Sequence, residues 1–278
     1  MSTHESEVAR GERFEFGANW RRFLDRVSPH RIETARRSLA TMLDVETLAG
    51  VSFLDVGSGS GLFSLAARRL GARVRSFDYD PQSVAATRAL KERFFAGDPE
   101  WTIEDGSVLD RAYLEALGSF DVVYAWGVLH HTGALWQAMD NAAISVAPGG
   151  RLFVAIYNHQ RIWTPVHTAL KRAYARAPRP ARWMLAGSSI AYYVSRGLVK
   201  DLVLLRNPLA RYRNYDDRSR GMSWWHDQLD WIGGYPFETA TPEAVFAFYH
   251  KRGFALVRMT TCGGDRGCNQ FVFRRERA

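Results

Sequence analysis

An acidic residue and a glycine-rich turn follow one another between residues 53 and 61, which read FLDVGSGSG. The apolar residues around Asp55 predict a buried strand, and Gly57, Gly59 and Gly61 allow a tight turn that a ligand can approach closely. A helical pattern starts directly afterwards, and the free N–H groups at a helix start face the same place. The segment therefore predicts a site for a nucleotide-like ligand.

Two features of this segment separate the possible ligands. In the dinucleotide fingerprint the third glycine follows the second by three residues, but that position is Leu62. The carboxylate of Asp55 would repel a pyrophosphate and attract an ammonium group. A second acid, Asp78, ends the next predicted strand, where it could hold two ribose hydroxyls. S-adenosylmethionine, which has an ammonium, a sulfonium and a ribose but no phosphate, matches these groups.

These segments resemble motifs I and II of the class I S-adenosylmethionine-dependent methyltransferases, and later segments continue the resemblance in the family's order. Residues 101–110 look like the third strand and the adenine-binding turn, residues 120–131 like strand four, and residues 146–158 like the Pro-Gly-Gly turn into strand five. Ser107 stands where the family usually has an acid. Two other interpretations of the glycine segment are possible. It could be a structural turn without a ligand in another α/β protein, or it could belong to a dehydrogenase.

The resemblance implies S-adenosylmethionine as the cofactor and S-adenosylhomocysteine (SAH) as its product. The cofactor-binding residues that it implies are Asp55, Gly57, Ser58, Gly59, Asp78, Tyr79, Gly106, Ser107 and Trp126.

Strand and helix patterns alternate up to residue 158, which predicts an α/β fold with helices on both faces of a parallel sheet. The resemblance implies a Rossmann-like, seven-stranded and mostly parallel sheet with an antiparallel last strand and a helical insertion after strand five. Thr241, Pro242 and Glu243 have the residue types of a helix start after that insertion. The predicted parts are an N-terminal tail and cap helix (1–50), a cofactor-binding core (51–158), an acceptor lid (159–238) and a return to the core with the last helix and strands six and seven (239–278).

The N-terminal part is predicted to have two distinct halves. Residues 1–13 are polar and mostly charged, so we expect a loose tail and no secretion signal, and a cytoplasmic location. A helical pattern runs over residues 21–43, and the aromatic residues before it could either cover the cofactor or only attach the helix to the sheet.

Aromatic and titratable residues are densest between residues 220 and 238. Such a mixture is typical of a ligand pocket, although a packed pair of helices is an alternative. If the segment is helical, His226 and Asp230 lie on one face at i, i+4 spacing and can pair. The acceptor-binding residues that we predict are Trp20, Tyr157, Trp225, Asp227, Asp230 and Tyr235.

Methyl transfer from a sulfonium is an in-line displacement, so the protein mainly aligns the reactants and excludes water. A hydroxyl acceptor also needs a base, and histidine titrates near neutral pH. His131 matches the position where related enzymes place a histidine near the transferred methyl, and His226 is the second candidate; either could instead be structural. His130 is expected to turn away. We predict methylation of a small molecule, at a hydroxyl, with histidine-assisted deprotonation.

The composition limits the possible partners. The net charge is +8, but the arginines crowd residues 21–37 and 161–220 without a recognisable RNA-binding module. Solvated helix faces explain most of this positive charge. Alternatively, some of these arginines could bind a phosphate group on the acceptor. We do not expect nucleic acid as a partner. Cys262 and Cys268 are too few for a disulfide framework or a four-ligand metal site, so no metal is expected.

Residues 181–205 are rich in apolar residues but are interrupted by charges, so they are not expected to cross a bilayer. They could lie on a membrane surface, and the ubiquinone-pathway O-methyltransferases, which this core resembles, act on lipophilic acceptors. Three rival functions therefore stay open: methylation of a lipophilic quinol-type acceptor at a membrane surface, methylation of RNA or protein, and binding without catalysis. The sequence predicts neither the acceptor's identity nor the oligomeric state.

Overall fold

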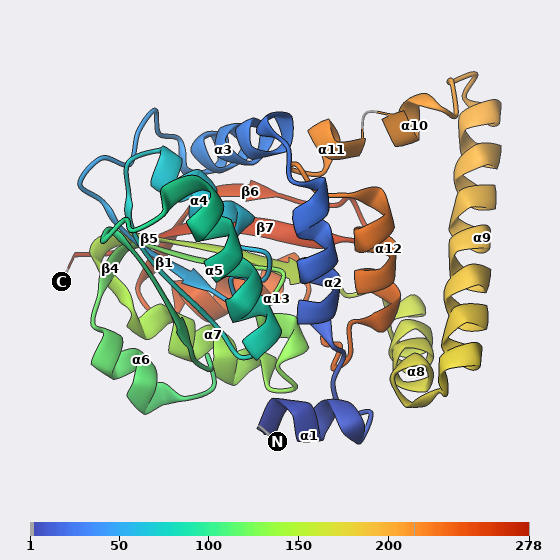
Figure 1. Cartoon of the computed structure of the whole chain (residues 1–278), viewed down its shortest axis with the longest axis horizontal. Helices are drawn as coiled ribbons and strands as arrows, with labels where there is room; N and C mark the ends of the chain where they lie inside the picture. Colours follow the sequence, from blue (N-terminus) through green and yellow to red (C-terminus); the bar gives the residue numbers. More distant parts are fainter. Residues whose placement is uncertain (1–2, 214, 278) are drawn as a thin grey trace.

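The computed structural model describes residues 3–213 and 215–277, and seven strands of this part of the chain form one sheet (Figure 1). Their order is β3-β2-β1-β4-β5-β7-β6. Neighbouring strands pair in parallel from β3 to β5, whereas β7 is antiparallel to both β5 and β6. The strands are β1 (Ser52–Val56), β2 (Arg73–Asp78), β3 (Trp101–Asp105), β4 (Phe120–Trp126), β5 (Val146–Tyr157), β6 (Phe254–Thr260) and β7 (Cys268–Arg275). The predicted α/β fold, with its antiparallel last strand, is confirmed.

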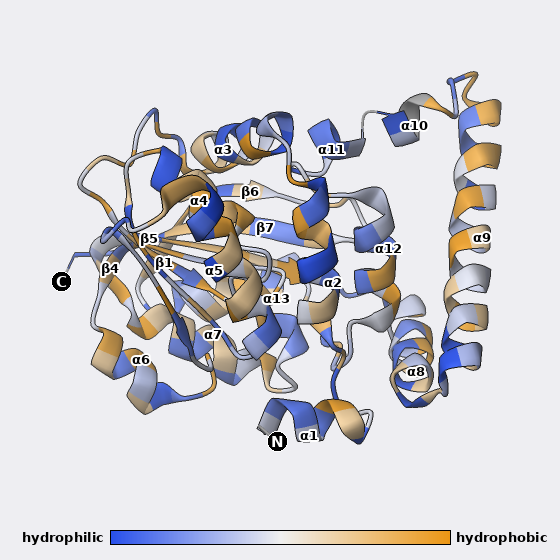
Figure 2. Ribbon diagram, viewed as in Figure 1, coloured by the Kyte–Doolittle hydropathy of each residue, from blue (hydrophilic) through white to orange (hydrophobic). Residues whose placement is uncertain are grey.

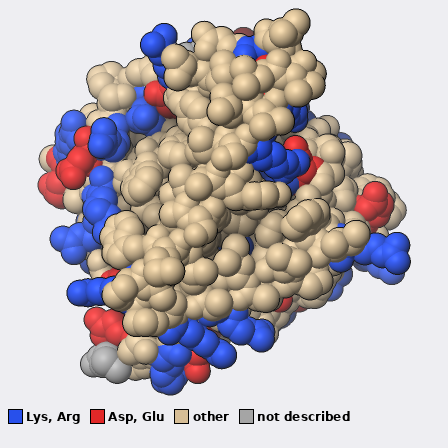
Figure 3. All heavy atoms as spheres, turned by 90° about the vertical axis from the view of Figure 1, so that its right-hand side faces the viewer, with Lys and Arg blue, Asp and Glu red and all other residues tan. Residues whose placement is uncertain are grey.

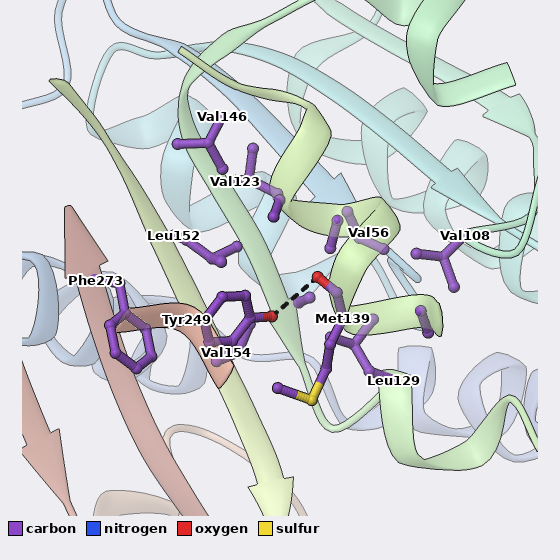
Figure 4. Close-up of a cluster of buried hydrophobic side chains, with 14 of the residues drawn as sticks. Val56, Val108, Val123, Leu129, Met139, Val146, Leu152, Val154, Tyr249 and Phe273 are labelled. Carbon is purple, nitrogen blue, oxygen red and sulfur yellow. Dashed lines mark hydrogen bonds between the residues drawn. The ribbon is translucent and has the colours of Figure 1, made fainter. Parts of the chain in front are cut away.

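Helices cover both faces of the sheet, because successive strand residues point to opposite sides. Phe53 of β1 packs into the cluster shared with α3 (Pro29–Leu43), α4 (Leu62–Arg69) and α5 (Pro81–Phe95). Its neighbour Leu54 packs into the cluster on the other face, shared with α6 (Arg111–Leu117), α7 (Leu135–Ile144) and α13 (Pro242–His250). Figure 4 shows this second cluster, in which the hydroxyl of Tyr249 donates to the carbonyl of Met139 at 3.3 Å.

Capping residues set the helix boundaries. The hydroxyl of Ser28 accepts from the N–H of Arg31, and Pro29 starts α3. The helix predicted over residues 21–43 is therefore broken into α2 (Phe16–Phe23), the 3-10 turn η1 (Leu24–Arg26) and α3. The predicted helix start at Thr241 is confirmed, since its side chain accepts from the N–H of Ala244 at the start of α13.

The expectation of a loose tail over residues 1–13 is wrong for its described part. Residues Thr3–Ala9 form α1, and His4 is buried with one ring nitrogen 3.6 Å from Asp80. Nη1 of Arg13 donates to the carbonyl of His131 at 2.9 Å. Polar contacts with the core thus order this segment, and a polar composition by itself does not show them.

The insertion after β5 contains helices with two different surroundings. Its helices are α8 (Trp163–Arg176), α9 (Arg179–Val203), α10 (Ala210–Arg213), α11 (Tyr215–Arg218) and α12 (Trp224–Gly233). Helix α12 lies beside α2, whereas α9 stands at the outer edge, away from the sheet (Figure 1). Apolar residues recur along α9 (Figure 2), yet among its residues only Ala186 and Asp201 are buried. Within the described residues, no helix is long and apolar enough to span a bilayer.

Candidate active site

A cavity of about 500 Å³ lies where the parallel strands end, between the sheet, α2 and α12. The ends of β1, β2, β4 and β5 contribute Asp55, Asp78, Trp126 and Tyr157 to its wall. In open α/β sheets, ligands bind at this carboxyl edge. The volume falls within the usual range for a small-molecule site. We call the part beside the glycine turn the cofactor half and the part beside α12 the acceptor half.

The glycine turn is the tightest part of the cofactor half. Gly57, Gly59 and Gly61 have φ values of 72°, 56° and 77°, a left-handed region that side chains disfavour. A Cβ on Gly57 would lie 2.5 Å from a methyl group of Val128. A Cβ on Gly59 would lie 3.1 Å from Nε1 of Trp20, so α2 covers the turn. Glycine is required here by both backbone conformation and space.

Two carboxylates flank this turn, that of Asp55, which is buried, and that of Asp78, which is half-buried. Asp55 is 2% exposed, and burial raises its pKa to about 7 although the hydroxyl of Ser64 donates to it. Burial likewise raises the pKa of Asp78 to about 6. The carboxylate of Asp78 accepts from the N–H groups of Gly59 and Asp80, each at 2.9 Å. Because neither acid has a cationic partner among the described residues, a bound cation would stabilise their ionised forms.

All the residues predicted to bind the cofactor lie in the cavity wall. They are Asp55, Gly57, Ser58, Gly59, Asp78, Tyr79, Gly106, Ser107 and Trp126. Their contacts with a cofactor stay a prediction.

Four of the six residues predicted to bind the acceptor also line the cavity, namely Trp20, Tyr157, Asp227 and Asp230. The hydroxyl of Tyr215 donates to Asp227 at 2.7 Å, and burial raises the pKa of this acid to about 6. Burial also raises the pKa of Asp230 well above its ordinary value, and its Oδ1 accepts from Asn19 at 3.3 Å. The acceptor half thus contains two acids that hold protons more tightly than usual.

The other two acceptor residues are placed differently from the prediction. Trp225 is 46% exposed and lies outside the cavity wall. The face of α12 that lines the cavity carries Asp227 and Asp230, and Trp225 precedes Asp227 by two positions, which turns it to the opposite side. Tyr235 also lies outside the wall, where its hydroxyl accepts from Nε of Arg172 at 3.2 Å.

His226 is not in the cavity wall either. It is buried against Phe23, with 5.6 Å between ring centroids, and its Nδ1 has no partner among the described residues. The predicted pair of His226 and Asp230 is wrong, because Asp230 bonds to Asn19 instead. The spacing was suitable, but packing turned the imidazole toward α2.

His131 and His130 both line the cavity, so the expectation that His130 turns away is wrong. Nδ1 of His131 lies 2.7 Å from the carbonyl oxygen of Pro236, a geometry in which this nitrogen carries the proton. Burial lowers the pKa of His131 to about 3 and that of His130 well below its ordinary value. Nδ1 of His130 accepts from the N–H of Tyr157 at 3.3 Å. Both rings are therefore neutral near pH 7.

Three arginines in the wall had no place in the predicted site: Arg13, Arg220 and Arg266. The guanidinium of Arg220 lies over the ring of Trp126, 3.1 Å from its centroid. These residues come from the N-terminal segment, the insertion and the turn before β7, and no motif joins them. Only Arg220 could have been suspected from the sequence, because it stands at the start of the aromatic segment 220–238.

Among the described residues, one group of side chains is arranged closely enough to hold a metal ion: His30, Asp216 and Asp217. It lies outside the cavity wall. Nε2 of His30 is 2.9 Å from Asp217, and Asp216 is 3.6 Å from Arg31. These carboxylates already have partners, so the group gives no argument for a metal.

A family profile described as a methyltransferase domain matches residues 54–152. The ubiquinone biosynthesis O-methyltransferase of Methylobacterium sp. (strain 4-46) is 32% identical over 163 residues, which cover 55% of this chain and 63% of that relative. Its counterpart from Xanthomonas euvesicatoria pv. vesicatoria (strain 85-10) is 34% identical over 147 residues, which cover 53% and 55%. The chain thus spans less than two thirds of the length of these relatives.

Solved structures share the fold. The magnesium protoporphyrin IX methyltransferase from Synechocystis PCC 6803 with bound SAH has a TM-score of 0.52 at 14% identity, over 88% of this chain and 83% of that one. An O-methyltransferase family protein from Burkholderia thailandensis has a TM-score of 0.52 at 13% identity, over 89% and 57%. At such identities the likeness concerns the arrangement of the elements.

Proposed function

We propose that this chain, whose residues 54–152 form a methyltransferase domain of the class I fold, transfers the methyl group of S-adenosylmethionine to a small molecule. The matched methyltransferase domain supports the predicted family and cofactor, and the solved structures share the fold. The observation that carries the proposal is a single cavity that joins the glycine turn to the acidic face of α12. Direct transfer requires donor and acceptor to meet in one such space.

The residues of the cofactor half fit S-adenosylmethionine. Asp55 is buried, Asp78 is half-buried, and both acids have raised pKa values, which suits an ammonium group and ribose hydroxyls. When bound, the cofactor supplies an activated methyl group. Trp20 lies over Gly59 and Phe16 lines the same wall, so α2 excludes water from the turn.

The proposed acceptor group is a hydroxyl whose proton passes to a residue of the acceptor half. His131 is the proposed proton acceptor, because it is neutral near pH 7 and lines the cavity. Asp230 is the alternative, since its raised pKa makes its carboxylate a stronger base than His131. His226 is no longer a candidate because it does not reach the cavity.

One observation favours the narrower alternative of a lipophilic acceptor taken from a membrane surface by a cytoplasmic enzyme. Helix α9 and the chain after it leave large apolar side chains uncovered, among them Met184 at 73% and Leu205 at 95% exposure. Figure 3, which views this side of the molecule, shows a broad surface with few charged side chains, and basic residues with some acidic ones lie along its edges. A surface of this kind suits contact with anionic lipid. Sedimentation with anionic vesicles tests it, and a protein that stays in the supernatant would contradict it.

The experiment for the main proposal combines binding with product analysis. The purified protein is titrated with SAH by calorimetry, and then incubated with S-adenosylmethionine and a panel of small phenols while SAH release is followed. We expect SAH binding and acceptor-dependent SAH release. Absence of SAH binding would overturn the proposal. Methylation of added RNA or protein with steep salt dependence would replace the small-molecule acceptor by a macromolecule.

A further inference from the structure

Arg266 lies in the turn between β6 and β7 and lines the acceptor half of the cavity. Cys268 pairs with Tyr157 in the ladder between β7 and β5. The turn before Cys268 is therefore held at the carboxyl end of β5, opposite the face of α12. A side chain from the far end of the sequence thus reaches the place where the acceptor is proposed to bind.

Two rings and an amide hold the guanidinium of Arg266. Its central carbon lies 3.6 Å from the ring centroid of Tyr193 on α9 and 4.2 Å from that of Trp231 on α12. Its Nη2 donates to Oε1 of Gln228 at 3.3 Å. These contacts fix the position of the guanidinium, but none of them brings a negative charge.

No described carboxylate forms an ion pair with Arg266. The adjacent Asp265 forms an ion pair with Arg196 on α9 instead, at 3.4 Å from its guanidinium. Asp227 and Asp230 line the same cavity, but they accept from Tyr215 and Asn19. Nη1 of Arg266 is buried without a partner among the described residues.

Arg266 is half-buried, and a charge that is partly removed from water without a counter-charge is costly unless a ligand supplies the missing group. Burial accordingly lowers the pKa of Arg266. The planar guanidinium matches carboxylate and phosphate oxygens better than any other side chain. The aromatic rings of Tyr157 and Trp231 provide apolar wall on the same side of the cavity.

Resting on the proposed methyl transfer, we propose that the acceptor carries an anionic oxygen group, a carboxylate or a phosphate, and that Arg266 binds it. Arg266 is then a specificity-determining residue, and the uncharged body of the acceptor lies against the neighbouring rings.

The test compares charged and neutral probes on the SAH-saturated protein by calorimetry. Benzoate and benzamide have the same shape but differ in charge, and phenyl phosphate represents the second anion. We expect wild-type protein to bind at least one anion about 10- to 100-fold more tightly than benzamide, the range that a charged hydrogen bond supplies. The anion that binds more tightly identifies the group on the acceptor.

Two variants and one control decide the role of Arg266. Arg266→Met removes the charge and should abolish the preference for the anion, whereas Arg266→Lys should keep part of it. Arg196→Gln removes an exposed charge beside the same turn and should leave the preference unchanged. SAH affinity should be equal in all four proteins, which shows that the variants are folded.

Other outcomes would overturn the inference. They are equal binding of benzamide and both anions by wild type, no binding of either anion, or an anion preference that persists in Arg266→Met. A wild-type protein that binds no SAH would instead refute the proposed function. The same anion titration without SAH would then still decide whether Arg266 is an anion site.

Discussion

The two halves of the cavity are built in different ways. The glycine turn and both of its acids lie within a short stretch of sequence, from Asp55 to Asp78, and local conformation places them. The acceptor half draws on α2, η2 (Leu129–His131), β5, α12 and the turn before β7. A site on one strand–turn–helix unit can be recognised from spacing alone. A site assembled from distant segments depends on how those segments pack.

The largest expected effect lies in the cofactor half. Gly57→Val forces a side chain into a left-handed position and against Val128, so SAH binding should be lost in calorimetry. Gly97→Val is the matched control, because Gly97 has a similar φ of 69° and no atom near its Cβ position. Normal SAH binding by Gly57→Val would contradict the cofactor site, while loss in both variants would indicate general damage.

The second-largest expected effect is a loss of turnover without a loss of SAH binding, caused by changes in the acceptor half of the cavity. His131→Asn should lower the acceptor turnover rate by about 10²–10⁴-fold if His131 takes the proton, with nearly unchanged SAH affinity. Asp230→Asn gives the same measurement for the alternative base. His226→Asn is the control outside the cavity and should retain most of the activity. Full activity in both test variants would leave alignment as the only contribution of the protein.

A smaller effect concerns pH in the cofactor half. The pKa of Asp55 is about 7, so below that pH a proton must leave before the carboxylate can pair with an ammonium group. The affinity for SAH should therefore fall about tenfold between pH 8 and pH 6, as one titrating group requires. Calorimetry between pH 6 and pH 8 measures the SAH affinity. The Asp55→Asn variant should show no change of affinity over this range. A constant wild-type affinity would contradict a role for Asp55.

A smaller difference is expected between two tryptophans of α12, Trp225 and Trp231, in their effect on the acceptor KM. Because it faces away from the cavity, Trp225→Ala should change the acceptor KM by no more than about twofold, as is usual for an exposed site. Trp231→Ala removes a ring of the wall and should raise KM clearly more. Steady-state kinetics of both variants tests the orientation of the helix, and a larger effect of Trp225→Ala would refute it.

The smallest expected effect is that of chelation. Methyl transfer from a sulfonium needs no Lewis acid, so EDTA should leave turnover unchanged. The control is a variant of the exposed group, Asp217→Asn, which should behave as wild type. Loss of activity with EDTA and recovery with magnesium would instead indicate a metal that aligns paired hydroxyls.

Much of the fold was predictable because its signals are local. Strand and helix periods, the proline and N-cap at Thr241 and the glycine spacing around Gly57 each depend on a few neighbouring residues. The predictions failed for two different reasons, because a local cap was overlooked in one segment and distant contacts order the other. The helix over residues 21–43 breaks at the Ser28 cap, and α1 is ordered by contacts with Asp80 and with the chain around His131.

The sequence by itself determined the cofactor half, since steric limits on φ and the spacing of Asp55, the glycines and Asp78 leave little choice. Only the tertiary structure decided the acceptor half. The rotation of α12 about its axis, which turns Asp230 inward and Trp225 outward, is set by packing against other elements. The approach of Arg266 likewise depends on strand pairing between β5 and β7. Such contacts join residues far apart in the chain, and spacing along the sequence carries no information about them.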